Sequence, residues 1–176
     1  MGTQHKSLSD ADVQFIKNQK LFYLASSSGK EVNLSPKGYD CIRVLDANTL
    51  LFMSYPGSGN RTHTDAVNNG EFTIVFNSFE KKAKILRIFC RAKIVGPGMP
   101  RFDNYLELFD ERRELVRDFF EFSVYAVETS CGGSVPFMEY KGERPSLKKW
   151  VVKMDKNHKL EDYKEDHFQP PDLHKL

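Results

Sequence analysis

The stretch ILRIFCRAKIV at residues 85–95 alternates strictly between two kinds of side chain, which is the pattern of a β-strand with two unlike faces. One face is apolar and carries Leu86, Ile88, Cys90, Ala92 and Ile94. The other face is largely basic around an aromatic ring and carries Ile85, Arg87, Phe89, Arg91 and Lys93. The stretch therefore predicts one long strand whose first face lies in the core.

Shorter strands precede this stretch, and the links between them are too short for the crossovers that parallel strands require. We expect these strands at residues 21–26, 31–34, 41–45, 50–54 and 72–76. Helices are expected at residues 7–18, where Ser9 is the capping residue, and at residues 61–68. This succession predicts an antiparallel barrel or sandwich.

Beyond residue 95 the pattern mixes helices and strands. Helices are expected at residues 102–109, 111–121 and 145–154, and strands at residues 122–129 and 134–140. We expect a single domain over residues 1–154. The charged residues 155–176, with Pro170 and Pro171 near their end, are expected to form an extended or loosely ordered tail.

Composition excludes several classes of protein. The chain has 176 residues, of which 40% are apolar, so it can build one hydrophobic core, and its net charge of +2 argues against a nucleic-acid partner. Cys41, Cys90 and Cys131 lie far apart and the histidines lack ligand spacing, so neither a disulfide framework nor a metal site is expected. No signal peptide or membrane-length apolar run is apparent, so we expect a cytoplasmic protein without a membrane partner.

Two polar interruptions are candidates for a binding site. The stretch VNLSPKGYD at residues 32–40 contains a proline, which strand interiors seldom tolerate, so it is either an ordinary turn or a break that brings Lys37 against a ligand. Residues 58–62 open the helix at 61–68, where Arg61 and Thr62 suit a phosphate group and Lys37 would be a second cation. The alternative for Arg61 is a solvated arginine on a surface helix.

The ordered series LFYLASS, VNLSPKGYD, LLFMSY, GSGNRT, FTIVF and ILRIFCRAKIV resembles the pyridoxamine 5'-phosphate oxidase-like flavoproteins, the FMN-binding split-barrel family. The likeness covers roughly residues 8–95, and the later segment SCGGSVPFMEY resembles an uncharacterised subgroup. The resemblance implies a mainly β fold with flanking helices, built on a six-stranded antiparallel split β-barrel. It also implies a homodimer with two FMN sites at the subunit interface.

The same resemblance assigns roles to individual residues. Ser35, Pro36 and Lys37 would line the flavin, and Ser54 would touch its ring or ribityl chain. Asn60, Arg61 and Thr62 would hold the phosphate, and Arg87 would approach the flavin or the dimer contact. Ser134, in the segment from Gly133 to Val135, would come from the second subunit.

The sequence also departs from the enzymes that give the family its name. Those oxidases carry an arginine- and lysine-bearing strand where this chain has NLSPKG, and an Arg–Lys pair where it has Arg61 and Thr62. The resemblance therefore implies an FMN-dependent oxidoreductase with an unassigned small-molecule substrate. The alternative is a non-catalytic flavin- or haem-binding module on the same fold. No catalytic side chain is identified, since the flavin would itself carry the redox step.

Overall fold

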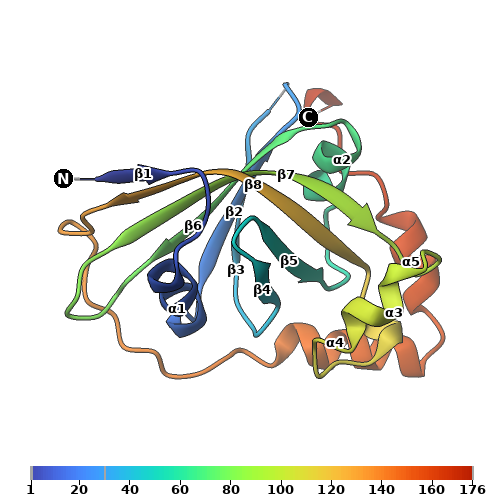
Figure 1. Ribbon diagram of the computed structural model, residues 1–176. Helices are drawn as coiled ribbons and strands as arrows, with labels where there is room; N and C mark the ends of the chain where they lie inside the picture. Colours follow the sequence, from blue (N-terminus) through green and yellow to red (C-terminus); the bar gives the residue numbers. More distant parts are fainter. Residues whose placement is uncertain (1, 30, 176) are drawn as a thin grey trace.

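The structure is a computed structural model that describes residues 2–29 and 31–175. Its centre is one antiparallel sheet in which the strands follow the order β3-β2-β6-β7-β8-β5-β4, with β1 paired to β8 (Figure 1). The strands are β1 (Thr3–His5), β2 (Phe22–Ser27), β3 (Asn33–Lys37), β4 (Ile42–Asp46), β5 (Thr49–Ser54), β6 (Glu71–Asn77), β7 (Ile85–Val95) and β8 (Asp118–Ser130).

The six strands that the resemblance implied are too few. The sheet has eight, and within the described residues no pairing joins the end strands β3 and β4 to close it. The broader expectation of an antiparallel, mainly β fold with flanking helices is confirmed. The long strand β7 has the bounds that its alternation predicted, because it lies between β6 and β8 and its apolar residues face the core.

Short helices flank the sheet: α1 (Asp10–Asn18), α2 (Arg61–Val67), α3 (Arg101–Leu106), α4 (Ser146–Lys156) and α5 (Leu160–Asp166). Single 3₁₀ turns lie at Arg113–Leu115 and Leu173–Lys175. Figure 1 shows α3, α4 and α5 gathered at one end of the sheet, while α2 lies beside the C-terminal segment. The helical end is fixed by a small separate cluster in which Leu115, Val151 and Leu160 are buried.

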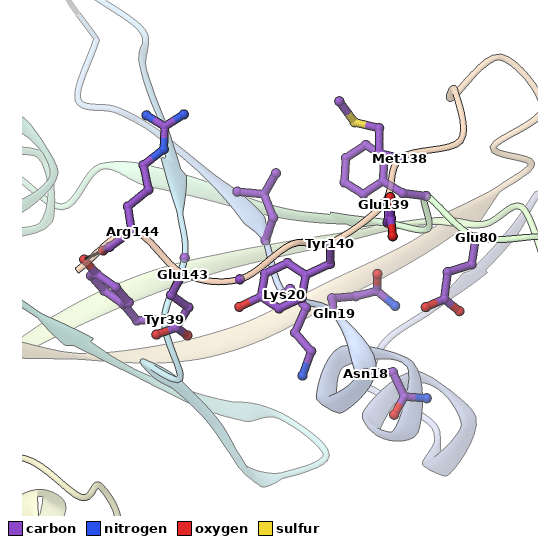
Figure 2. Close-up of a pocket in the computed structure, with 14 residues that line it drawn as sticks. Asn18, Gln19, Lys20, Tyr39, Glu80, Met138, Glu139, Tyr140, Glu143 and Arg144 are labelled. Atoms are coloured by element: carbon purple, nitrogen blue, oxygen red, sulfur yellow. Dashed lines mark hydrogen bonds between the residues drawn. The ribbon is translucent and has the colours of Figure 1, made fainter. Parts of the chain in front are cut away.

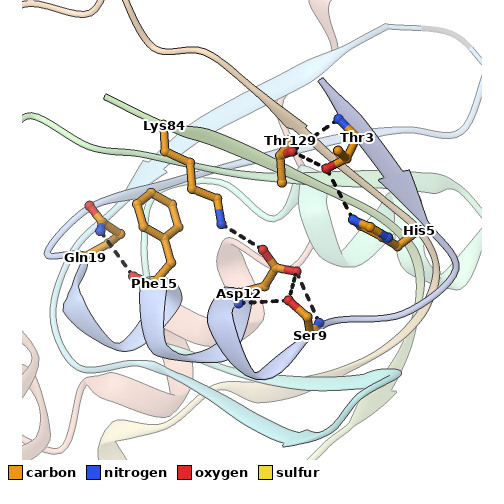
Figure 3. A network of polar contacts seen from close by, with 8 residues as sticks. All are labelled: Thr3, His5, Ser9, Asp12, Phe15, Gln19, Lys84 and Thr129. Carbon is orange, nitrogen blue, oxygen red and sulfur yellow. Dashed lines mark hydrogen bonds and ion pairs between the residues drawn. The ribbon is translucent and has the colours of Figure 1, made fainter. Parts of the chain in front are cut away.

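Helix α1 is held to the sheet by an ion pair (Figure 3). Ser9 caps the helix by accepting from the backbone N–H of Asp12, while the Asp12 carboxylate accepts from the backbone N–H of Ser9. The other carboxylate oxygen of Asp12 accepts from Lys84 Nζ at 2.8 Å, across the loop that leads into β7. The cap that the sequence predicted therefore also joins the helix to the core.

The main core is aromatic and aliphatic. Leu86, Ile88 and Cys90 of β7 are fully buried, and Ala92 and Ile94 pack at its margin. Edge-to-face ring pairs such as Phe72 with Phe122 fill the space between strands. The largest side chains with almost no exposure are Phe72, Phe76, Phe102, Phe119, Phe120 and Phe122.

Several local predictions were wrong. The helix expected at 111–121 is a 3₁₀ turn followed by the start of β8, because Phe119 and Phe120 pair with β5. The residues expected as a strand at 134–140 form no strand, and the tail that was expected to be extended or loosely ordered contains helix α5. The chain does not break at residues 35–38 either: Pro36 lies within β3, where it is tolerated because β3 is an edge strand.

Candidate functional site

A pocket of about 210 Å³ lies between the edge strand β3, strand β5 and the loop before α2. It brings together five of the residues that the sequence singled out: Pro36, Lys37, Ser54, Asn60 and Thr62. Its remaining walls are mostly aromatic, apolar or glycine: Gly38, Tyr39, Cys41, Phe52, Met53, Tyr55, Gly57, Gly59, Phe120 and Leu147. We call it the β3–β5 pocket.

Lys37 is the cation of this pocket. Strand β3 places it there because Lys37 pairs with Phe22 of β2 at the end of the sheet, where its side chain alternates with that of Pro36. Burial lowers the pKa of its ammonium group, only partly offset by the nearby Cys41 thiol. Lys37 forms no ion pair with any carboxylate in the described part of the chain, and its ammonium nitrogen lies over the face of the Phe52 ring.

The opposite wall is an amide and a hydroxyl. Asn60 is buried, with 6% of its surface exposed; its side-chain N–H group donates to the backbone oxygen of Phe168 at 2.9 Å, while its oxygen accepts from Arg117 at 3.4 Å. Thr62 accepts from Asn33 Nδ2 at 3.1 Å, which leaves its hydroxyl proton available to a ligand. Both groups therefore present donors, as an anion requires.

Sequence reasoning missed Arg117. It lies just before β8 and is 7% exposed, and among the described residues its guanidinium group donates only to neutral oxygens, those of Asn60 and of the Gly57 backbone. Burial lowers its pKa, and the charge of neighbouring Asp118 opposes that effect. A charged pair inside the apolar run LVRDFF was the signal that could have revealed it, since charges are rarely buried without a role.

Arg61 does not line the β3–β5 pocket. One of its guanidinium nitrogens is paired with Glu31, and the other donates to the backbone oxygen of Pro171 at 2.6 Å. Helix α2 that follows it has only seven residues, so the donors of this region are side chains rather than a long helix dipole. The expected phosphate-holding group is thus divided: Asn60 and Thr62 face the pocket and Arg61 lies behind them.

Three other expected residues lie elsewhere. Ser35 is on β3 but does not line the pocket. Arg87 donates to Ser130 and pairs with Glu128 across to β8, while Ser134 lies in the exposed segment after β8. These residues are not brought to the pocket within one chain.

The rim of the pocket is an aromatic and charged cluster. The rings of Tyr39 and Tyr55 meet edge to face at 5.7 Å, and Lys148 of α4 lies over both of them. Tyr55 donates to Glu111 at 2.6 Å, so burial and this carboxylate both raise the pKa of the phenol. The phenol therefore stays protonated, and the rim offers flat apolar surfaces beside a cation.

A second cavity of about 480 Å³ adjoins the first at Gly38 and Tyr39 (Figure 2). The segment after β8 arches over it, tied at one end by Met138 N–H to the oxygen of Phe79 and at the other by the Tyr39 hydroxyl to the oxygen of Arg144. Figure 2 shows Lys20 and Tyr140 within this space. Its rim mixes carboxylates with cations, and the arching side chains are exposed, so its walls select no one ligand.

Among the described residues there is no group of three or more histidine, cysteine, aspartate or glutamate side chains that could hold a metal ion. None of the helices within residues 2–29 and 31–175 has the length and apolarity that crossing a membrane requires.

Comparisons with known proteins agree with this architecture. No family model matches the chain. A pyridoxamine 5'-phosphate oxidase family protein of Aspergillus flavus, ustO, is 30% identical over 145 residues, which are 77% of this chain and 56% of that protein. The chain thus spans about half the length of this curated relative.

Solved structures resemble the chain in fold. HupZ of Group A Streptococcus superposes with a TM-score of 0.58 at 17% identity, over 69% of this chain and 98% of that one. A candidate pyridoxamine 5'-phosphate oxidase from Lactobacillus delbrueckii superposes with a TM-score of 0.56 at 16% identity, over 70% of this chain and 98% of that one.

The sheet and the pocket together define an antiparallel β protein with a site beside an edge strand that suits an anion. The chain belongs to the pyridoxamine 5'-phosphate oxidase-like family.

Proposed function

We propose that the protein binds FMN in the β3–β5 pocket and acts as an FMN-dependent oxidoreductase on a small molecule. The observation that carries the proposal is Lys37, a half-buried ammonium group in that pocket without a carboxylate partner among the described residues. A buried cation is costly unless an anion accompanies it, and a flavin phosphate or a reduced flavin ring is such an anion. Family membership supports the same cofactor.

The residues present fit the chemical parts of FMN. Phe52, Phe120 and Tyr55 offer apolar walls for a flat ring, and Asn60 and Thr62 offer donors for a phosphate. Arg117 stands behind Asn60 as a further positive charge. When bound, the flavin would supply the electron transfer, while these residues would bind it, orient it and exclude water.

The pocket is smaller than the site that a whole FMN needs. Its 210 Å³ is below the roughly 300–1,000 Å³ usual for ligand sites of this size, so one chain would enclose only part of the cofactor. We therefore propose a homodimer in which a second copy completes the split-barrel site. Large exposed side chains near β3 support this, since Val32 is 78% and Leu34 62% exposed, and Phe137 and Met138 of the arching segment are also exposed.

The basic face of β7 supports the dimer less than the sequence suggested. Arg87 is paired with Glu128 and Arg91 with Glu71, so these charges are already satisfied within one chain.

All three cysteines are free, as in proteins of reducing compartments, and we propose a cytoplasmic location on that ground.

The proposal is tested by titrating the purified protein into FMN and following flavin fluorescence, with riboflavin as the comparison ligand. We expect FMN to bind more tightly than riboflavin, which lacks the phosphate. Sedimentation equilibrium at micromolar concentration then tests the dimer. Absence of FMN binding would refute the cofactor, and a monomer mass with FMN bound would refute the shared site. FMN binding without turnover of any donor would identify the non-catalytic module.

A further inference from the structure

The C-terminal segment lies against Asn60, which lines the β3–β5 pocket, and against Arg61, which follows it in the chain but lies outside that pocket. Helix α5 ends at Asp166, and the chain then runs over the loop before α2. We call residues 167–171 the C-terminal strap. Two of its backbone oxygens accept hydrogen bonds there: that of Phe168 from Asn60 Nδ2 at 2.9 Å, and that of Pro171 from Arg61 at 2.6 Å.

Ring contacts anchor the strap at the end that leaves α5. The His167 ring stacks on Tyr163 with centres 3.9 Å apart, and Tyr163 in turn packs edge to face on Trp150 of α4. The Phe168 ring lies edge to face on His63 at 5.1 Å, although about half of it, 49%, remains exposed. Ring contacts therefore fix the strap where it leaves α5, and beyond the Phe168 ring the hydrogen bond from Arg61 holds it.

The donors beneath the strap are oriented before any ligand arrives. The oxygen of Asn60 accepts from the buried Arg117, which fixes the amide with its N–H group outward. Arg61 is fixed by Glu31 through one nitrogen, so its other nitrogen is aimed at the strap. Both outward groups are donors, and the strap meets them with oxygens only.

The two prolines give the strap the hydrogen-bonding character of an anion. Pro170 and Pro171 have no backbone N–H, so this part of the chain presents acceptors without donors, as the oxygens of a phosphate do. The proline rings also restrict the backbone, which lowers the entropy lost when the strap docks.

We propose that the C-terminal strap competes with the phosphate of the flavin for Asn60 and Arg61, so that the strap must leave these donors before a phosphorylated ligand binds fully. The inference rests on the proposed function, since it concerns the same site. It makes the C-terminal segment a gate for phosphorylated ligands and leaves ligands without a phosphate unaffected.

The test uses the full chain with a loosened strap. Phe168→Ala together with Pro171→Gly removes the ring contact with His63 and makes the free strap more flexible. Leu173→Ala is the matched control, because Leu173 lies beyond both hydrogen bonds and is 48% exposed. FMN and riboflavin are titrated against wild type and both variants.

The loosened strap should raise FMN affinity about tenfold, the scale of one charge-assisted hydrogen bond, and leave riboflavin affinity unchanged. The Leu173→Ala protein should match wild type for both ligands. An FMN-to-riboflavin affinity ratio that is the same in all three proteins would refute competition between the strap and the phosphate, while leaving the proposed FMN site intact.

If wild type binds neither flavin, the proposed function fails. A measurement without flavin then tests whether the strap and a phosphate compete for the same donors. Hydrogen exchange of the amides in residues 168–173 is compared in inorganic phosphate and in chloride of equal ionic strength. Competition predicts faster exchange in phosphate, because the anion takes the donors from the strap. Equal exchange in the two salts would overturn the inference.

Discussion

The ammonium group of Lys37 lies 5.8 Å from the centre of the Phe52 ring within the β3–β5 pocket. Strand β3 brings the cation there and strand β5 brings the ring, although the two strands lie at opposite parts of the sheet order. The pocket is thus formed where the open sheet curls its two ends toward each other. A planar ligand placed there would meet an aromatic wall and a positive charge together.

Replacing Lys37 tests whether that charge acts on the flavin. Lys37→Ala should weaken FMN binding and lower the reduction potential, because a cation near the ring stabilises the reduced anion more than the neutral oxidised form. A shift of about 30 mV would correspond to about 1.4 kcal/mol for this two-electron couple. Reductive titration with a reference dye measures it.

The matched control is Lys81→Ala, which removes an exposed lysine from the loop between β6 and β7. It should change neither the affinity nor the potential, since a surface substitution is worth about half a kcal/mol or less. If Lys37→Ala behaves like Lys81→Ala, then β3 carries Lys37 for structural reasons alone.

Arg61→Ala separates the phosphate from the rest of the flavin. Loss of a charge-assisted hydrogen bond of about 1.5–3 kcal/mol should weaken FMN binding by roughly tenfold or more and leave riboflavin unaffected. Arg112→Ala is the control, because Arg112 pairs with Asp155 at the exposed helical end of the molecule. Equal FMN affinity in the two variants would place the phosphate away from Arg61.

Gly70 marks a close approach between α2 and the sheet. A Cβ atom there would lie 2.6 Å from the backbone oxygen of Ser27 and 2.7 Å from that of Asp65. Neither oxygen can move without shifting β2 or α2, so Gly70→Ala should destabilise the fold by about 1–3 kcal/mol. Urea unfolding measures this, with Gly98→Ala as the control, since a Cβ atom at Gly98 meets nothing within 4 Å. An unchanged unfolding midpoint for Gly70→Ala would contradict this close packing.

Periodicity predicted the parts of the fold that local pattern controls. The alternation of residues 85–95 predicted both bounds of β7, because from Ile85 to Ile94 each residue of the apolar face is more buried than its neighbours on the basic face. The apolar stripe at residues 111–121 suggested a helix and was misleading. Phe119 and Phe120 are adjacent strand residues opposite Met53 and Phe52, and pairing with β5 outweighs helical preference.

The residues of the candidate site could be predicted only where the segment that contains them carries its own sequence signal. Lys37 and Thr62 could be proposed from their own segments, since β3 and the α2 loop each signal a change in structure. The contacts that Arg117 and the strap make with Asn60 could not be predicted, because they join residues 57 and 108 positions apart, although the charges inside LVRDFF marked Arg117 itself as unusual. Such contacts depend on the order of strands in the sheet, which no local pattern reports.

Acid should weaken the attachment of α1 through Asp12. Burial alone would raise the pKa of this carboxyl group, but hydrogen bonds from Lys84 and Ser9 outweigh burial and hold it below the usual 3.8. The ionised group therefore stabilises the fold fully above pH 3.8, and this contribution is lost as pH falls through the lower folded pKa.

Asp12→Asn isolates that contribution. At pH 7 it should destabilise the protein by about 3 kcal/mol, because it leaves Lys84 without its buried partner. The difference from wild type should shrink as pH falls below 3.8, where wild type also loses the charge. Urea unfolding across this range measures both proteins, with Asp10→Asn as an exposed control on the same helix. A constant difference at every pH would mean that Asp12 acts through shape and capping, and that its charge contributes nothing to the attachment of α1.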